Sequence, residues 1–414
     1  MSKKRKIRTD FRKNREIRTR QKDYTEHFDN EDFDEELAER VRAKGKFSRK
    51  RTVAGAEITE DASGTVVLPE IDQQECQLGR VLCVKGLVSL VEDAQGMVHP
   101  CTIRRLLKSL ATDQRHVVAA GDHVWFRTVG GRPDVHPDPQ RTQPYSNEPS
   151  ATAGLSEGII ERIEPRRGVL SRTSRGQQQV IVANVDQLII VVSAAEPRIK
   201  PNLIDRLLVT AERARICPVI CINKIDLVNP ADLMPLVGVY GRLGYRVLMT
   251  SAETHFGIQQ LRNQLVGQET VVTGQSGVGK SSLLNAMQPG LDRKVQVVSR
   301  ETQKGRHTTT TAELIRLELP LPVNTVDAPS NLPQAGLPPA SYVVDTPGIR
   351  QFELWDVIPE EVAGYFRDIR PYVSKCRYSD CTHTHEEACA VKDAVADGWV
   401  DTRRYESYVQ IREG

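Results

Sequence analysis

The chain has 414 residues, a formal net charge of +3 and a hydrophobic content of 39%. This length predicts two to four domains rather than one. No apolar run approaches the ~18 residues of a membrane-spanning helix, and the N-terminus lacks the apolar core of a secretory signal, so neither is expected.

Residues 1–74 are predicted to form a disordered tail. Residues 3–22 are strongly basic, residues 29–39 are acidic, and residues 44–51 are again basic. Blocks of like charge cannot bury enough apolar surface to form a packed core. The basic residues either bind RNA phosphates or only keep the tail soluble, and we favour RNA contact.

Residues 75–165 are predicted to form a small β-barrel. Short stretches rich in β-branched residues lie at 79–92, with a turn at Gly86, and at 97–103, 123–128 and 158–163. Strands at this spacing are typical of a barrel. An oligonucleotide-binding (OB) fold is favoured, and a purely structural β-module is the alternative. Residues 130–154, rich in Pro, Gly, Ser and Asn, are predicted to be a loop.

Residues 166–355 alternate between strand and helix patterns. Strands are expected at 186–192, 217–222, 245–249 and 269–273, and helices at 203–214, 230–243, 259–266 and 281–287. This alternation predicts an α/β domain with a largely parallel sheet and helices on both faces. Ligands of such sheets bind beyond the carboxyl ends of the strands.

A phosphate-binding loop, Gly274-x4-Gly279-Lys280-Ser281, follows one of these strands and opens a helix. Backbone N–H groups of the glycine-rich loop and the helix N-terminus bind phosphate oxygens. Lys280 is expected to contact the β- and γ-phosphates, and Ser281 is expected to bind Mg²⁺. The predicted nucleotide contacts are Gly274, Gln275, Ser276, Gly277, Val278, Gly279, Lys280, Ser281 and Ser282.

A guanine-reading motif, Asn223-Lys224-x-Asp226, follows an earlier apolar strand. The Asp226 carboxylate can accept hydrogen bonds from guanine N1 and the exocyclic amine, and adenine offers neither donor. We therefore predict GTP as the substrate, with an ATP-driven enzyme a distant alternative. Ser251 and Ala252 are expected to offer a backbone N–H to the guanine oxygen. Because this motif precedes the phosphate loop, the reverse of the usual order, a circular permutation is predicted.

Two further segments resemble nucleotide switches. Asp345-Thr346-Pro347-Gly348 follows an apolar strand, so Asp345 is expected to hold Mg²⁺ through water and Gly348 to sense the γ-phosphate. The threonine-rich segment 305–310 has the place of a first switch, with Thr308 or Thr309 reaching the metal. Ile349 stands where Ras-like enzymes have a water-orienting Gln. His307 is the candidate catalytic group, and the alternative is an exposed loop histidine.

Residues 356–414 are predicted to form a small, mostly helical zinc-binding domain. Cys376, Cys381, His383 and Cys389 supply three thiolates and one imidazole, the ligand set of a closed structural zinc site. Unrelated buried thiols are the alternative. The other five cysteines, Cys76, Cys83, Cys101, Cys217 and Cys221, are scattered, so a reducing, cytoplasmic compartment is expected. The flanking Arg367, Arg370, Lys375, Arg377 and Lys392 either face RNA or form a solvated surface.

The order of these motifs and the Cys-x4-Cys-x-His-x5-Cys spacing resemble those of the RsgA (YjeQ/EngC) family of small ribosomal subunit biogenesis GTPases. The resemblance covers residues 75–414. It implies an OB barrel, a circularly permuted GTPase domain and a zinc domain. It also implies a GTP hydrolase that binds the small (30S) ribosomal subunit and 16S rRNA and acts as a switch in late maturation.

Two segments depart from the family pattern, namely the charged tail and an apparent insertion at residues 322–340. The phosphate loop has no Asn before Lys280, so activation by potassium is not expected. The competing function is a GTP-regulated RNA-binding scaffold with incidental turnover. We expect a monomer with no membrane partner. We also expect loss of the γ-phosphate to reorient the zinc domain through residues 349–355.

Overall fold

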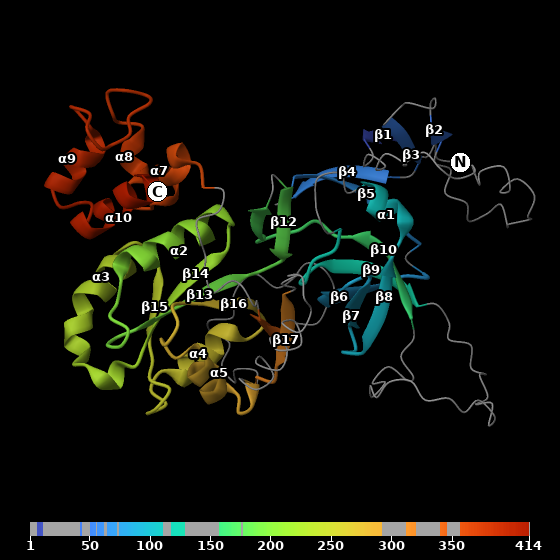
Figure 1. Ribbon diagram of the computed structural model, residues 1–414, viewed down its shortest axis with the longest axis horizontal. Helices are drawn as coiled ribbons and strands as arrows, with labels where there is room; N and C mark the ends of the chain where they lie inside the picture. Colours follow the sequence, from blue (N-terminus) through green and yellow to red (C-terminus); the bar gives the residue numbers. More distant parts are fainter. Residues whose placement is uncertain are drawn as a thin grey trace, which may run out of the picture.

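The computed structural model describes residues 6–10, 42–43, 50–54, 56–61, 64–72, 74–110, 117–128, 157–174, 177–291, 312–319, 340–345 and 357–413. Figure 1 shows an α/β body in the middle, with a β-barrel on one side and a group of short helices on the other. The three predicted bodies therefore follow one another along the chain and in space.

Strands occur near the N-terminus, where a disordered tail was predicted. β1 (Lys6–Asp10), β3 (Lys50–Ala54) and β2 (Arg42–Ala43) form an antiparallel sheet in that order. β4 (Ala56–Asp61) and β5 (Gly64–Pro69) pair as an antiparallel hairpin. The structure departs from the prediction because β-branched residues, which favour extended backbone, lie among the charges in β1, β3, β4 and β5.

Five strands close into a barrel: β6 (Gln77–Lys85), β7 (Val88–Asp93), β8 (Val98–Ile103), β9 (His123–Thr128) and β10 (Gly158–Ile163). The strand order is β6-β7-β8-β10-β9, and β6 also pairs with β9. Helix α1 (Arg105–Leu110) lies between β8 and β9 in the chain. Val81, Val91, Phe126 and Ile160 fill the interior. This five-stranded closed topology confirms the predicted OB-type barrel. The predicted loop at 130–154 lies outside the described residues.

A hairpin, β11 (Leu170–Ser174) and β12 (Gln177–Val182), leads from the barrel to the central sheet and was not predicted. Just beyond it, the N–H of Ala183 donates to the carbonyl of Ala120 at 2.9 Å, and Asn184 Nδ2 donates to the carbonyl of Gly121 at 2.8 Å. These bonds attach the connecting segment to the base of the barrel.

The central sheet has the order β15-β14-β13-β16-β18-β17. Its strands are β13 (Gln187–Ser193), β14 (Cys217–Asn223), β15 (Arg246–Met249), β16 (Glu269–Thr273), β17 (Glu313–Leu317) and β18 (Ser341–Asp345). All pairings in it are parallel except that of β17 with β18, which is antiparallel. The largely parallel sheet is thus confirmed, and β17, which lies between β18 and the barrel strand β6, was not predicted.

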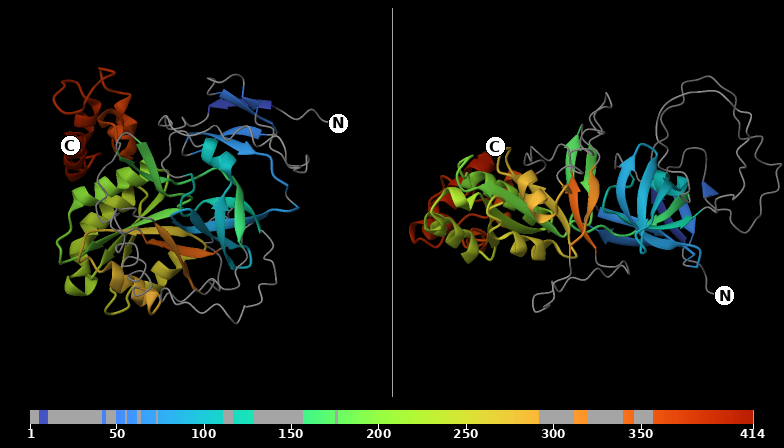
Figure 2. Two further views of the ribbon diagram at one scale, coloured as in Figure 1. Left: turned by 45° about the vertical axis from the view of Figure 1, so that its right-hand side comes forward. Right: turned by 90° about the horizontal axis from the view of Figure 1, so that it is seen from below.

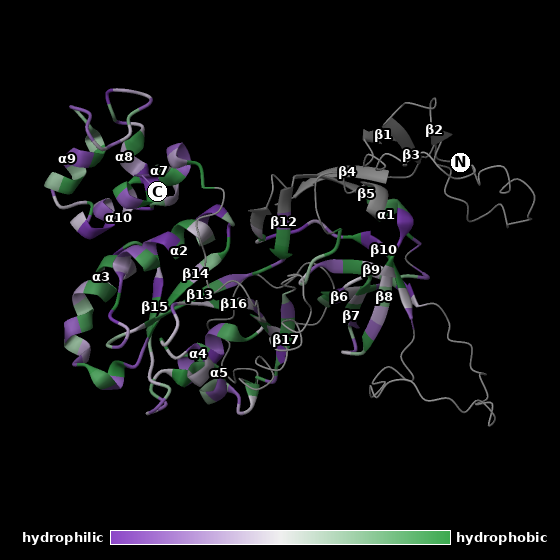
Figure 3. Ribbon diagram, viewed as in Figure 1, coloured by the Kyte–Doolittle hydropathy of each residue, from purple (hydrophilic) through white to green (hydrophobic). Residues whose placement is uncertain are grey.

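Helices cover both faces of this sheet, as predicted. α2 (Pro201–Arg213) and α3 (Met234–Arg242) pack on one face, and α4 (Ile258–Leu265) and α5 (Lys280–Met287) pack on the other. Short turns η2 (Ile225–Leu227) and η3 (Pro230–Leu233) precede α3. Figure 3 shows that α2 and α3 each carry hydrophobic and hydrophilic sides, the pattern of helices lying on a core.

The C-terminal helices are η4 (Pro359–Glu361), α7 (Val362–Tyr365), α8 (Arg370–Val373), α9 (Ala390–Ala396) and α10 (Thr402–Glu413). Their core includes Phe366, Ile369 and Tyr408, and it also takes in Val209 from α2. The C-terminal domain therefore shares a core with the helix on which it sits. No helix within the described ranges is long and apolar enough to cross a membrane.

Candidate nucleotide-binding site

Both nucleotide motifs lie at the carboxyl ends of strands in one sheet. β14 ends at Asn223, and β16 ends at Thr273, directly before Gly274. Only β13 separates these two strands in the sheet. Parallel strands end at the same edge, so the two loops face a common space although the chain visits them in the reverse of the usual order.

The phosphate loop depends on glycine at defined positions. A Cβ on Gly274, whose φ is 147°, would lie 2.1 Å from the carbonyl oxygen of Val191. Gly277 and Gly279 have φ values of 85° and 92°, in the left-handed region that side chains disfavour. A Cβ on Gly279 would lie 2.4 Å from Asn223 Nδ2. The loop therefore needs glycine both for its turns and for its approach to the guanine-reading motif.

Lys280 begins helix α5, and its ammonium group folds over the loop. Its Nζ donates to the carbonyls of Gly274 at 2.7 Å and Gln275 at 2.9 Å. Ser276, Gly277, Ser281 and Ser282 are exposed, whereas Val278 is buried against the core. The loop thus presents exposed residues and a helix N-terminus on the open side, an arrangement suited to an anion.

Asn223 joins the two motifs directly. Its side chain is buried, and Nδ2 donates to the carbonyl of Val278 in the phosphate loop at 2.9 Å. Lys224 follows with a φ of 62°, and its Nζ donates to the carbonyl of Glu196 at 2.6 Å. Asp226 lies in η2 and is exposed. A rigid residue therefore joins the loops, and the carboxylate that should read guanine is open to a ligand.

The loop after β15 braces the guanine-reading motif. The N–H of Thr250 donates to the carbonyl of Ile222 at 2.8 Å, and its carbonyl accepts from the N–H of Ile225 at 3.3 Å. The N–H of Ser251 donates to the carbonyl of Phe256 at 3.0 Å, so it is engaged within its own loop. Ala252 follows and is half-buried. The bracing by Thr250 and Glu196 was not predicted, because backbone carbonyl contacts leave no signal in the sequence.

Of the residues predicted for the two switches, the structure describes Asp345. His307, Thr308, Thr309 and Gly348 lie outside the described residues, as does the apparent insertion apart from Ala340. Asp345 is the last residue of β18, the strand beside β16. Its backbone therefore ends at the same edge of the sheet as the phosphate loop.

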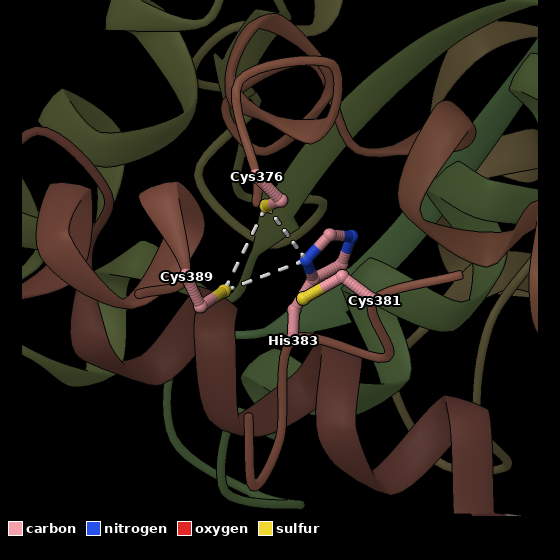
Figure 4. A group of neighbouring side chains, drawn as sticks. All are labelled: Cys376, Cys381, His383 and Cys389. Atoms are coloured by element: carbon pink, nitrogen blue, oxygen red, sulfur yellow. Dashed lines mark hydrogen bonds between the residues drawn. The ribbon is translucent and has the colours of Figure 1, made fainter. Parts of the chain in front are cut away.

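The C-terminal domain brings Cys376, Cys381, His383 and Cys389 together, with one ligand atom from each lying within 4.8 Å of the others (Figure 4). The Sγ atoms of Cys376 and Cys389 are 3.9 Å apart, and they lie 3.4 and 3.5 Å from His383 Nδ1. A tetrahedral zinc with Zn–S of about 2.3 Å and Zn–N of about 2.0–2.1 Å requires edges of about 3.8 and 3.5 Å. These residues therefore fit zinc.

Hydrogen bonds fix the loop that carries these four residues. The Glu386 carboxylate accepts from both N and Oγ1 of Thr382 at 2.6 Å. From α10, the hydroxyls of Tyr405 and Tyr408 donate to the carbonyls of His383 and Thr382, each at 2.8 Å. Such outer bonds orient metal ligands before the metal arrives.

One of the basic residues near this site turns inward. Arg367 Nε donates to Glu212 Oε1 at 2.6 Å, and its guanidinium lies 4.1 Å from the centre of the Tyr245 ring. Arg367 therefore attaches the C-terminal domain to α2 and to the turn that follows α3. Lys375 and Arg377 lie over the rings of Tyr372 and Tyr378.

A guanine-reading loop and a phosphate loop that meet on one sheet in permuted order define a circularly permuted P-loop GTPase. Its accessory parts are an OB-type barrel and a helical domain with a Cys₃His cluster. The comparisons with known proteins agree with this class. The family model described as RsgA GTPase matches residues 163–329.

A relative, "Small ribosomal subunit biogenesis GTPase RsgA" of Sodalis glossinidius (strain morsitans), is 36% identical over 343 residues, covering 81% of this chain and 85% of that one. The crystal structure of YjeQ from Thermotoga maritima matches with a TM-score of 0.58 and 32% identity over 82% of this chain and 98% of that chain. YloQ, described as a circularly permuted GTPase, matches with a TM-score of 0.56 and 25% identity over 83% and 97%. The chain belongs to the RsgA family of ribosome-biogenesis GTPases and is a GTP hydrolase.

Proposed function

We propose that this GTPase is a nucleotide-dependent switch that binds the small (30S) ribosomal subunit, contacts its 16S rRNA and acts late in its maturation. The bond between Asn223 and Val278 is the observation that carries the nucleotide half of the proposal, because it ties base reading to phosphate binding in one site. The subunit half is supported by the name of the relative that is 36% identical.

In the proposed site, Asp226 accepts hydrogen bonds from guanine N1 and the exocyclic amine, and Lys224 packs along the base. Ala252 offers its amide to the guanine oxygen, since the N–H of Ser251 is engaged with Phe256. Lys280 leaves the carbonyls of Gly274 and Gln275 and moves to the β- and γ-phosphates. Phosphate oxygens are stronger acceptors than neutral carbonyls, so this exchange is favourable.

Magnesium and the switches complete the proposed site. Mg²⁺ would be held by Ser281, by Thr308 or Thr309, and by Asp345 through water, and Gly348 would sense the γ-phosphate. We propose His307 as the group that promotes attack by water, because Ile349 cannot orient it. His307→Ala should lower turnover and leave GTP affinity nearly intact. Unchanged turnover in this variant would remove His307 from the mechanism.

The accessory parts have proposed roles as well. One structural Zn²⁺ held by the Cys₃His cluster would stabilise residues 356–414, a segment too small to sustain a large core of its own. The proposed division is a tail at 1–74, the barrel at 75–165, the GTPase domain at 166–355 and the zinc domain at 356–414. The basic residues of the tail would add salt-dependent contacts to rRNA phosphates. We also propose a cytoplasmic monomer, which light scattering of the purified chain would test.

Co-sedimentation with purified small subunits tests the switch. The chain should pellet with the subunit when a non-hydrolysable GTP analogue is bound and should stay in the supernatant with GDP. A ligand shifts an equilibrium only through differential affinity, so equal pelleting in both states contradicts the switch. The alternative, an RNA-binding scaffold, predicts equal pelleting in both states and GTP turnover that does not change when subunits are added.

A further inference from the structure

The barrel is attached to the GTPase sheet through β17 and β18. The right-hand view in Figure 2 shows the orange strands of these elements between the α/β body and the blue barrel. β17 pairs with β18 over its whole length, and Glu313 at its start also pairs with Cys83 of the barrel strand β6. The barrel and the central strands thus form one continuous sheet.

The attachment reaches the residues next to the switches. Glu313 lies opposite Asp345 in the pairing of β17 with β18. Cys83, Glu313 and Asp345 therefore occupy one rung across three adjacent strands. β18 runs into the Asp-Thr-Pro-Gly sequence, and β17 follows the threonine-rich segment. A displacement of the barrel would be transmitted along this rung to the edge where nucleotide binds.

Glu92 of barrel strand β7 connects to both switch-bearing strands. Its Oε1 accepts from Arg316 Nη1 of β17 at 2.8 Å, and its Oε2 accepts from the Tyr342 hydroxyl of β18. Glu92 and Tyr342 are only 6% and 1% exposed. Burial raises the pKa of Tyr342 to about 12, so its hydroxyl stays protonated and can donate. Leaving a buried carboxylate without hydrogen-bond donors costs free energy. The bonds from Arg316 and Tyr342 therefore favour the observed position of Glu92.

A second group of charges lies beside Tyr342, between the barrel and β16. The Arg80 guanidinium lies 4.6 Å from the centre of the Tyr342 ring and pairs with Glu269 of β16 at 2.6 Å. His123 Nε2 lies 3.6 Å from the same Glu269 oxygen. Two carboxylates and two guanidinium groups therefore lie between the barrel and strands β16, β17 and β18. Paired charges of this kind favour one geometry of the attached strands.

We propose that Glu92 is a positioning residue for GTP hydrolysis, which sets the placement of β17 and β18 and thereby of the switch residues that precede β17 and follow β18 in the chain. The barrel, when it engages its partner, would change turnover through the same bonds. This proposal rests on the metal and switch roles proposed above for Asp345 and its neighbours. It couples the barrel to the nucleotide site, whereas the sequence led us to expect that loss of the γ-phosphate reorients the zinc domain.

Turnover by the chain alone, with GTP and Mg²⁺, tests the proposal in Glu92→Gln and Tyr342→Phe variants. We expect kcat to fall by about three- to tenfold with KM for GTP and GDP affinity unchanged, because the base and phosphate loops lie on other strands. Arg316→Gln is a milder variant, since the Arg316 side chain is 53% exposed and its loss should spare folding.

Glu161→Gln is the matched control. Glu161 is a barrel carboxylate that is 7% exposed, and it pairs with Arg104 at 2.6 Å and Arg127 at 2.7 Å, within the barrel. The Glu161→Gln variant should keep wild-type turnover while losing about as much thermal stability as Glu92→Gln. Wild-type kcat in Glu92→Gln and Arg316→Gln, or an equal fall in Glu161→Gln, would overturn the proposal. The assay contains no ribosomal subunit. A result that overturns the role of Glu92 would therefore not contradict the proposed binding to the small subunit.

Discussion

Asn223 and Asp226 differ in burial and in contacts, so the proposed base-reading loop assigns them different roles. Asn223 is buried, and its amide donates to the carbonyl of Val278. It therefore connects its own loop to the phosphate loop. Asp226 is exposed, as the proposed contact with the base requires. A change at Asn223 should therefore damage the whole site, whereas a change at Asp226 should alter only which base is accepted.

Asp226→Asn should weaken GTP binding by about 100-fold or more. The amide oxygen can still accept from guanine N1–H, but without the negative charge, and the amide NH₂ is a donor that faces the donor of the exocyclic amine. Two charge-assisted hydrogen bonds of about 1.5–3 kcal/mol each are therefore weakened or lost. Xanthine has a carbonyl in place of the exocyclic amine, so an amide at this position can pair with it. Titration with fluorescent nucleotides would measure both affinities. Unchanged GTP affinity, or no gain for xanthosine triphosphate, would mean that Asp226 does not face the base.

Much of this site was predictable because the motifs are local. Glycines with positive φ and a lysine at a helix start form a phosphate loop wherever a strand leads into them. Glu92 was not predictable, since Tyr342 lies 250 residues further along the chain and only the folded sheet brings them together. Arg367 carried no distinguishing signal either, because its ion pair with Glu212 is a tertiary contact.

The loop that carries the Cys₃His cluster is the element whose stability we expect to depend on a metal. Cys376, Cys381 and Cys389 would repel one another as unpaired thiolates, and a metal converts this cost into stability. The chain should contain about one zinc per molecule. Cys389→Ser should lose the zinc and unfold the C-terminal helices, whereas Cys217→Ser, which changes an exposed thiol outside the cluster, should keep both.

Elemental analysis and circular dichroism would measure these two properties. A purified wild-type chain without zinc, or a Cys389→Ser chain that retains it, would contradict the assignment.

Elements with a strong apolar pattern were predicted well, whereas β17 was not predicted. β9, β10 and β16 have the predicted bounds, because their apolar and β-branched runs are bounded by turn residues. β17 has only Glu313–Leu317 and pairs antiparallel at the junction of two domains. Tertiary structure decides which strands β17 pairs with, so its five residues alone did not indicate a strand between β18 and β6.

On the scale of the whole molecule, Arg404 joins Arg367 in attaching the C-terminal domain to the GTPase domain. Arg404 is 2% exposed and donates to Asp205 of α2 at 2.6 Å. It also donates to both carboxylate oxygens of Asp368, at 3.0 and 2.9 Å, and lies 4.4 Å from the centre of the Phe366 ring. The C-terminal domain should therefore move together with α2.

Arg404→Ala should destabilise the chain by about 3–5 kcal/mol, because it leaves two carboxylates buried without their cation. The neighbouring Arg403 pairs with Asp401 at 3.0 Å, and its side chain is 47% exposed. Arg403→Ala should cost about 1 kcal/mol or less. Chemical unfolding of the two variants gives the comparison. Equal effects at both positions would show that the buried cluster does not hold the domains together.

Steady-state GTP turnover with and without purified small ribosomal subunits tests the central claim most directly. An assembly switch should be stimulated strongly by the small subunit, little by the large one, and not at all when Lys280→Ala has removed phosphate binding. Turnover that is the same with and without small subunits would contradict the account and leave a scaffold that hydrolyses GTP incidentally.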